Sequence, residues 1–331
     1  MADLRSELNI KNLHLRNRLV LPPMATEATA GDGLVTERLL RYYAEKAAGA
    51  FLGLVITEHC YIMPEGKASP GQVSAASDEA IPGLRRLTDT LHGCGVPCVC
   101  QINHAGGRAK QSVTGLPSAA PSAVWADGTR FSDRELSKAD ILAVVEAFAA
   151  AARRAKDAGY DAVEIHSAHS YLLNQFYSPL ANQRGDAYGG SLHNRLRIHF
   201  EVLEAVRGAV GEETPVFLRL GSIDDRPGGS ELADAVEASR LLAGAGVDVL
   251  DISGGFCGFV LRGREQEQGY FSFVSEAIRE AVSVPVILTG GVTDPLAADR
   301  LLRGGKADLI GVGRAILQDS RWPEKAFAAL G

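Results

Sequence analysis

The sequence lacks any stretch that could cross a membrane and any apolar leader. No window of about 18 uncharged apolar residues occurs, and the first ten residues, MADLRSELNI, lack the apolar core of a secretory signal. Net charge is −6, and the basic residues are scattered along the chain. A nucleic-acid partner would require a clustered basic surface. We therefore expect a cytoplasmic protein that binds neither nucleic acid nor membrane.

Cysteine is also scarce, with five residues in 331. An odd number without the paired spacing of zinc sites argues against a disulfide framework and a structural metal. Cys98 and Cys100 flank Val99 in a strand-like run, so their side chains share one face. We interpret them as small buried fillers.

What the sequence does contain is a repeated strand–helix unit. Strand-like apolar runs occupy residues 18–24, 52–57, 96–102, 162–165, 215–220, 247–252, 285–288 and 309–312. Amphipathic helix patterns occupy residues 36–48, 78–93, 138–158, 192–210, 231–244, 273–282 and 295–303. Gly159 and Gly246 each end a helix just before a strand, as in the short turns of right-handed parallel units. Eight such units predict a closed (β/α)8 TIM barrel.

An open doubly wound sheet is the alternative architecture, but it normally carries a glycine-rich fingerprint after its first strand, where this chain has Pro22-Pro23-Met24. Residues 8–15 alternate around Lys11-Asn12 and predict a hairpin that caps one end of the barrel. The Gly- and Pro-rich segment 105–137 predicts a long inserted loop after strand 3, lying over the barrel mouth. No linker or change of composition appears, so residues 1–331 are predicted to form a single domain.

The stretch from Glu164 to Arg195 begins at the end of a strand, where His166, His169 and Tyr171 occur within six residues. Polar residues at the carboxyl end of a barrel strand are placed where such folds carry their chemistry. The two histidines could be metal ligands, with Glu58, His59 or His104 as a third, or they could be core residues or hydrogen-bond donors to a substrate. Tyr171 is protonated at neutral pH and could donate a proton.

Two glycine turns follow the last two strands, Gly290-Gly291 after the seventh and Gly313-Arg314 after the eighth. Glycine lets backbone N–H groups approach an anion, and barrels commonly bind phosphate at these two loops. We therefore predict a phosphate site there. Arg219 lies within an apolar strand, where its charge requires either an ion pair, for which Glu164 has the right parity, or a bound ligand.

These residues resemble the Old Yellow Enzyme family, FMN-dependent NAD(P)H oxidoreductases built on a (β/α)8 barrel. The resemblance runs along nearly the whole chain. It is carried by Pro22-Pro23-Met24, by residues 101–108 and 164–171, by residues 174–195 with Asn174-Gln175-Phe176 and Tyr188-Gly189-Gly190-Ser191, and by Arg219 and Gly313-Arg314.

The resemblance implies FMN as cofactor and NADPH or NADH as hydride donor. It places the flavin against Pro23, Met24, Ala25, His59, Gln101, Arg219, Gly290, Gly291, Gly313 and Arg314. It implies that His166 and His169 bind the substrate's carbonyl, that Tyr171 protonates the substrate, and that Glu27 borders the substrate pocket. It is compatible with a homo-oligomer.

Two positions depart from the family pattern. Ala25 stands where relatives usually have Thr or Cys bonded to the flavin, with Thr26 adjacent, and Glu27 replaces a tyrosine. The chain also ends before the cysteine cluster of the larger dienoyl-CoA reductase-like members, so a single-domain relative of that branch is expected.

The expected function is an ene-reductase acting on α,β-unsaturated carbonyl or nitro compounds. Three alternatives stay open: a 2-enoate or dienoyl-CoA reductase-like flavin enzyme, a metal-dependent barrel lyase using His166 and His169, and a flavin-binding protein whose catalysis is weakened by Ala25 and Glu27.

Overall fold

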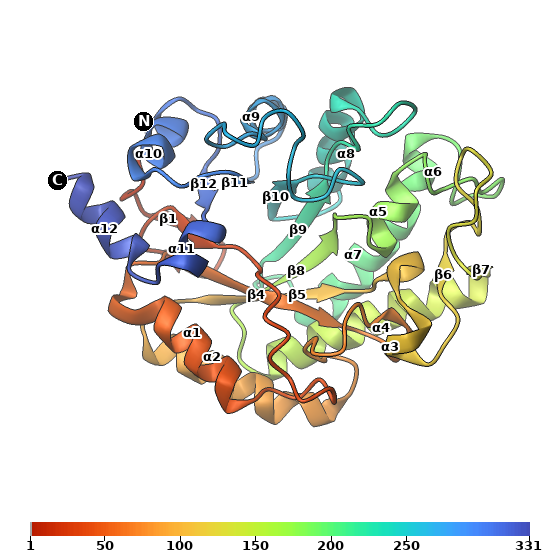
Figure 1. Ribbon diagram of the computed structural model, residues 1–331, viewed down its shortest axis with the longest axis horizontal. Helices are drawn as coiled ribbons and strands as arrows, with labels where there is room; N and C mark the ends of the chain where they lie inside the picture. The colour runs from red at the N-terminus through yellow and green to blue at the C-terminus, as the bar shows by residue number, and fades with distance from the viewer. Residues whose placement is uncertain (1) are drawn as a thin grey trace.

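The computed structural model describes residues 2–331, and its centre is a closed barrel of eight parallel strands (Figure 1). The strands follow each other around the barrel in chain order, and the last pairs with the first to close it. They are β3 (Leu19–Leu21), β4 (Leu54–Tyr61), β5 (Cys98–Asn103), β8 (Ala162–Ser167), β9 (Val216–Gly221), β10 (Val249–Ser253), β11 (Val286–Thr289) and β12 (Leu309–Gly311). The predicted (β/α)8 TIM barrel is confirmed.

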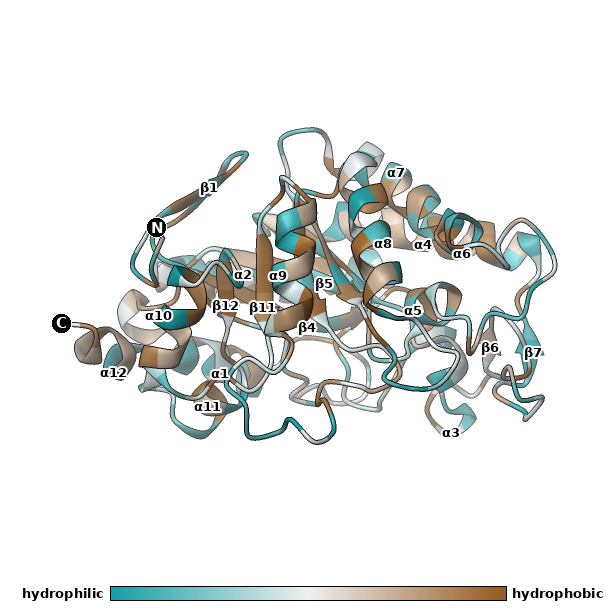
Figure 2. Ribbon diagram, turned by 90° about the horizontal axis from the view of Figure 1, so that it is seen from above, coloured by the Kyte–Doolittle hydropathy of each residue, from teal (hydrophilic) through white to brown (hydrophobic). Residues whose placement is uncertain are grey.

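Helices surround the barrel and turn their hydrophilic faces outward (Figure 2). The larger ones are α1 (Glu37–Ala47), α2 (Ile81–Gly93), α4 (Lys138–Asp157), α7 (Arg197–Val210), α8 (Leu232–Gly244), α9 (Ser272–Ala281), α10 (Pro295–Arg303) and α12 (Trp322–Ala329). Short helices are α3 (Gln111–Thr114), α5 (Leu172–Tyr177), α6 (Leu192–Arg195) and α11 (Arg314–Gln318). Within residues 2–331, no helix combines the length and apolarity needed to cross a bilayer.

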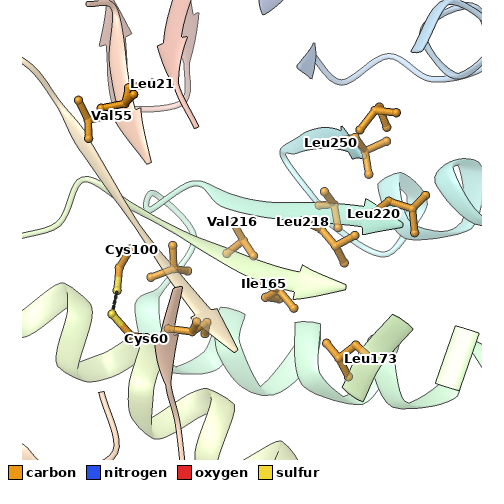
Figure 3. Close-up of a cluster of buried hydrophobic side chains, with 14 of the residues drawn as sticks. Leu21, Val55, Cys60, Cys100, Ile165, Leu173, Val216, Leu218, Leu220 and Leu250 are labelled. Carbon is orange, nitrogen blue, oxygen red and sulfur yellow. Dashed lines mark hydrogen bonds between the residues drawn. The ribbon is translucent and has the colours of Figure 1, made fainter. Parts of the chain in front are cut away.

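Alternation along the strands divides the core into two layers. Outward-facing side chains pack under the helices, and Figure 3 shows Val216, Leu218 and Leu220 spaced two residues apart along β9. Cys60 and Cys100 belong to this layer, with their sulfur atoms 3.9 Å apart. Cys98 is also buried there, so the interpretation of Cys98 and Cys100 as buried fillers is confirmed.

The inward-facing layer fills the barrel with one or two apolar side chains from every strand. Its members are Val20, Leu54, Ile56, Val99, Ala162, Phe217, Val249, Ile287 and Leu309. Ile10, Leu13 and Leu15 of the N-terminal hairpin, β1 (Leu8–Ile10) and β2 (Leu13–Leu15), belong to the same cluster. Lys11 at the hairpin turn pairs with Asp248 just before β10, so the hairpin caps the N-terminal end of the barrel, as predicted.

Three aspartates at the same end of the barrel make the same set of contacts, which we call the aspartate device. Asp161, Asp248 and Asp308 each precede a strand and accept a hydrogen bond from the first or nearly first N–H of the neighbouring strand, at 2.8, 2.8 and 3.0 Å. Each also contacts a cationic or imidazole side chain near the end of a helix, namely His92, Arg207 and Arg279 respectively. The device satisfies donors that the neighbouring strand leaves unpaired.

The inserted segment 105–137 contains α3 and two short strands, β6 (Ala119–Ala120) and β7 (Arg134–Glu135). Its aromatic side chains Trp125 and Phe131 contact each other in a tilted arrangement and meet Phe256, in the loop after β10, edge to face. The insertion was expected over the barrel mouth, but none of its residues lines the cavity described below. Contact between these half-buried rings and the buried Phe256 places the insertion beside the loop after β10.

Candidate active site

A cavity of about 500 Å³ opens at the carboxyl ends of the barrel strands. Its lining comes from residues that follow most of the strands. They are Pro22, Pro23, Met24, Ala25, His59, Gln101, His166, His169, Tyr171, Arg219, Ser253, Gly258, Phe259, Tyr270, Thr289, Gly290, Gly291, Val292, Thr293, Gly311, Gly313 and Arg314. The volume is that of a pocket for a cofactor-sized molecule.

The floor of the cavity is a layer of buried polar side chains directly above the apolar filling. Gln101 Nε2 donates a hydrogen bond to Glu164 Oε1 at 2.7 Å. Arg219 Nε lies 3.1 Å from Asp251 Oδ2, and Thr289 Oγ1 donates to Asp251 Oδ1 at 3.1 Å. We call these five residues the polar layer.

The ion-pair partner of Arg219 is therefore Asp251. The expectation that Glu164 pairs with Arg219, which rested on parity, was wrong. Asp251 lies directly opposite Arg219 in the register of β9 and β10, whereas Glu164 lies opposite Phe217. Burial and the Asp251 charge raise the pKa of Glu164 well above its usual range, while Arg219 opposes this shift. The close approach of Arg219 Nε to Asp251 Oδ2 is an ion pair without hydrogen-bond geometry, and Glu164 Oε2 also has no hydrogen-bond partner among residues 2–331. Because Arg219 lines the cavity, its guanidinium retains capacity to bind a polar ligand.

His166 and His169 reach the cavity from the end of β8 and the turn after it, with ring centroids 5.2 Å apart. The Ala168 N–H donates to His166 Nδ1 at 3.2 Å, which leaves the proton of the neutral ring on Nε2. His169 Nε2 lies 2.7 Å from the hydroxyl of Ser253. Burial lowers the pKa of both rings well below the usual value, so both are neutral.

The turn that carries His169 has an unusual backbone. His169 and Ser170 adopt φ values of 57° and 60°, which non-glycine residues rarely adopt. Asn174 on α5 holds this turn because its Oδ1 accepts from the Ser170 N–H at 2.8 Å. Arg108 Nε donates to the Ser170 hydroxyl at 2.9 Å. Such strain is maintained where the surroundings fix a functional geometry.

The Tyr171 ring lies beside two histidine rings, with its centroid 5.2 Å from that of His166 and 5.4 Å from that of His59, on β4. Burial raises the pKa of its phenol, the nearby Arg108 opposes the rise, and Glu27 adds to it. Tyr171 is consequently protonated at neutral pH, as a proton donor must be.

A β-bulge in β4 decides which side chain of that strand enters the cavity. Thr57 pairs with Cys100 and Cys60 pairs with Ile102, so two residues of β4 face the single residue Gln101. Before the bulge Leu54 and Ile56 face inward. Simple alternation would turn Glu58 inward next, but the extra residue places His59 in the cavity lining instead.

Glu58 is consequently buried behind the cavity. Its carboxylate accepts hydrogen bonds from the Thr26 hydroxyl at 2.7 Å and, more weakly, from the Thr26 N–H at 3.4 Å. Burial raises the pKa of Glu58 to about 7 despite these bonds. Because the Thr26 hydroxyl turns toward Glu58, it does not replace the side chain that Ala25 lacks, and Ala25 alone of the two lines the cavity.

The two glycine turns form a cradle on the side of β11 and β12. A Cβ atom on Gly291, whose φ is 73°, would lie 2.5 Å from the Tyr270 ring and 2.7 Å from the Glu267 carbonyl oxygen. Gly290 would meet the same ring, and Gly313 would meet Met24 Sδ at 2.7 Å. Arg314 Nη2 donates to the Tyr270 hydroxyl at 3.1 Å and also lines the cavity.

The structure thus brings together every residue predicted for the site except Glu27. Glu27 is exposed, adopts φ 50°, and lies close enough to influence Tyr171 without lining the cavity. The sequence reasoning missed Ser253, Phe259, Tyr270 and Thr289. The position of Ser253 and Thr289 at strand ends was the available signal, whereas nothing local marks Phe259 or Tyr270.

The histidine pair does not form a metal centre with other side chains of residues 2–331. The described group with three closely spaced ligand atoms is His92, Cys98 and Asp161, at the opposite end of the barrel. There Asp161 and His92 already serve the aspartate device. The metal-lyase alternative therefore lacks a third ligand at the cavity.

The residues present fit FMN. The glycine cradle leaves room that a single Cβ would fill, and Arg314 supplies a cation beside it. Gln101 and Arg219 offer an amide and a fixed positive charge on the cavity floor, as the polar edge of a flavin requires.

Comparison with known proteins also indicates a flavin enzyme. Residues 4–330 match the model of the NADH:flavin oxidoreductase / NADH oxidase family. The chain is 37% identical over 329 residues to an NADH oxidase from Thermoanaerobacter brockii, covering 98% of this chain and 50% of that protein. It is 35% identical over 323 residues to an NADPH dehydrogenase from Halalkalibacterium halodurans, covering 97% and 93%.

Two solved structures share the fold. A 2-naphthoyl-CoA reductase in complex with 2-naphthoyl-CoA superposes with a TM-score of 0.92 at 25% identity, covering 99% of this chain and 52% of that one. The Old Yellow Enzyme homologue from Zymomonas mobilis gives 0.85 at 26% identity, covering 99% and 93%. The chain thus spans about half the length of some relatives and nearly the full length of others.

Proposed function

Because the chain belongs to the NADH:flavin oxidoreductase / NADH oxidase family, within the Old Yellow Enzyme type, we propose that it reduces carbon–carbon double bonds conjugated to a carbonyl or nitro group. The observation that carries this proposal is the combination of two neutral histidines and a protonated tyrosine around one cavity. That set can polarise a carbonyl and supply a proton without a metal ligand set.

FMN would lie across the cavity, from the turns after β11 and β12 to the strands β5 and β9 that flank β8. Gly290, Gly291, Gly313 and Arg314 would bind its phosphate. Gln101 and Arg219 would bind the polar edge of its ring, and Pro23, Met24 and Ala25 would border it. When bound, FMN supplies a hydride that it has taken from NADH or NADPH.

His166 and His169 would bind the substrate's carbonyl oxygen. His166 has its proton on Nε2, directed away from the backbone contact at Nδ1, and both rings are neutral. Donors fixed before the reaction stabilise negative charge as it develops on that oxygen. Ser253 and Asn174 act as positioning residues, since Ser253 contacts His169 and Asn174 holds the turn that carries it.

Tyr171 would donate the proton that completes the addition of hydrogen. The Tyr171 hydroxyl keeps its proton because burial raises the pKa of the phenol.

We expect that Tyr171→Phe lowers the rate of alkene reduction by roughly 10²–10⁴-fold. Reduction of the flavin by NADPH should persist, because that step requires no proton from Tyr171. Anaerobic stopped-flow absorbance near 450 nm measures the two half-reactions separately.

Equal losses in both half-reactions would contradict the role of Tyr171. Purified protein that binds no flavin, or flavin that neither nicotinamide reduces, would overturn the proposed function itself.

An acyl-CoA ester is a second candidate substrate, favoured by the structural likeness to a 2-naphthoyl-CoA reductase complex. Enones and unsaturated acyl-CoA esters, each supplied to the reduced protein, separate the two. Reoxidation by the esters alone would select the second candidate.

A further inference from the structure

His59 is a third imidazole in the cavity. It is the one residue of β4 that is not fully buried, and the bulge is the reason that it faces inward. A bulge beside an active site commonly redirects a side chain. The local structure therefore presents this ring to whatever fills the cavity.

The tautomer of His59 is fixed by Gln72. The Ala68 N–H donates to Gln72 Oε1 at 2.6 Å, so the amide nitrogen of Gln72 is the atom that faces His59 Nδ1 at 2.7 Å. The Asn103 amide nitrogen also approaches Nδ1, at 3.3 Å. Because Nδ1 must accept, the proton of the neutral ring lies on Nε2.

The Nε2–H group has no acceptor among residues 2–331. Burial lowers the pKa of His59 to about 4, with a smaller contribution from Arg219, so the ring is neutral above pH 5. The ring centroid lies 5.4 Å from Tyr171 and 6.1 Å from His166. His59 is therefore a fixed neutral donor that lines the reaction cavity and has no partner within the protein.

The position of this donor differs from that of the other two histidines. His169 adjoins His166 on one side, at 5.2 Å, while His59 lies on the side of His166 nearest Tyr171. A carbonyl held by His166 and His169 would therefore leave the Nε2–H of His59 available to a different part of the substrate. A donor placed there can bind a second acceptor group.

We propose that His59 binds a second carbonyl oxygen of the substrate, so that the site favours alkenes carrying carbonyl groups at both ends. The inference rests on the proposed ene-reductase function. A site built to hydrogen-bond a substrate group discriminates against analogues that lack it, because its own donor is then left unpaired.

The test compares N-methylmaleimide, in which both alkene carbons carry a carbonyl, with 2-cyclopentenone, which has one. We expect His59→Phe to lower the ratio of kcat/KM for the two substrates by about tenfold, the loss of one hydrogen bond. His59→Gln retains a donor and should restore much of the ratio. His104→Gln is the control, because His104 is also an imidazole whose pKa burial lowers to about 4, but it does not line the cavity.

A second measurement does not depend on turnover. Absorbance titration of the FMN-loaded protein with 4-hydroxybenzaldehyde and 4-methylphenol compares ligands with and without a second acceptor. His59→Phe should weaken binding of the aldehyde about tenfold more than that of the methylphenol. Nitrogen-15 NMR of the imidazole should show Nδ1 unprotonated.

The role of His59 would be overturned if His59→Phe changed neither the kcat/KM ratio of the two alkenes nor the affinity ratio of the two phenols. A variant that altered only the flavin spectrum and the rate of flavin reduction would overturn it as well. Protein that reduces both alkenes while the ratio stays unchanged contradicts this inference alone. Protein that reduces neither contradicts the proposed function.

Discussion

Glu58 shows how one extra residue in a strand creates an unusual ionisable group. The bulge moves the carboxyl group behind the cavity, where burial raises its pKa to about 7 from an ordinary value of 4.5. A raised carboxyl pKa means that the folded state holds a proton that the unfolded state releases. The resulting stability is present below about pH 4.5 and is lost as the pH rises through 7.

Glu58→Gln should remove this dependence. Relative to the unmodified protein, the variant should gain up to roughly 3 kcal/mol in free energy of unfolding between pH 4.5 and pH 8, since each pKa unit corresponds to about 1.4 kcal/mol. Urea unfolding at several pH values measures the difference between the two proteins, in which the other titrating groups cancel. Parallel stability curves would show that Glu58 titrates normally.

Individual site residues could be predicted where reactive side chains directly follow an apolar strand in the sequence. His166, His169 and Tyr171 follow an apolar strand, so their location at the barrel mouth was foreseeable. The partner of Arg219 was not, because parity alone admits Glu164 while the register of neighbouring strands selects Asp251. The donor role of His59 depends on Gln72, thirteen residues away, and on a bulge that no local pattern announces.

At the scale of elements, the glycine cradle leaves no room for a side chain at Gly291. Gly291 combines a left-handed backbone with contacts that exclude a Cβ atom. Gly291→Ala should destabilise the fold by about 1 kcal/mol through its φ alone and should also weaken FMN binding at least tenfold by displacing Tyr270. FMN fluorescence titration and urea unfolding measure the two effects.

Gly305→Ala is the matched control. Its φ of 70° is nearly the same, but the nearest atom to an added Cβ is Arg279 Nη1 at 3.5 Å, away from the cavity. It should lose similar stability and keep its affinity for FMN. Equal losses of affinity would mean that backbone strain, and not the contact with Tyr270, governs the cradle.

Most elements were predictable because each strand and helix carries its own periodicity. The elements that differed had weaker local signals. β4 extends to Tyr61, beyond the expected end at Thr57, because the bulge breaks the alternation. α5 was not expected, since its residues are buried on every side and show no amphipathic pattern. The insertion was recognised as a loop, but its docking on Phe256 depends on distant aromatic contacts.

At the scale of the whole molecule, the barrel is filled from both ends in different ways. Apolar side chains and the hairpin close the N-terminal end, and polar side chains form the floor of the cavity at the other. The closed barrel followed from counting strand–helix units, and the hairpin from its alternation. The contacts of the hairpin with the barrel interior join segments that are far apart in sequence, and periodicity does not reveal such contacts.

Leu15 provides a test of the hairpin's contribution. It is fully buried in the same cluster as the barrel's inward-facing residues. Leu15→Ala should lower the free energy of unfolding by about 2–5 kcal/mol, as for other buried leucines. Leu142→Ala, at a position 56% exposed on α4, should change it by less than about 0.5 kcal/mol. Similar effects of the two changes in urea unfolding would show that the hairpin is peripheral to global stability.

The polar layer limits how far this protein could be adapted to heat. Buried ionisable side chains such as Glu164, Arg219 and Asp251 contribute less to stability than apolar side chains of the same volume would. Selection for thermal tolerance alone would therefore favour replacing them, but Arg219 lines the cavity, and Glu164 and Asp251 hold Gln101 and Arg219 in place there. Thermostable variants that keep their activity should accumulate their changes in the helices and the hairpin, while this layer stays as it is.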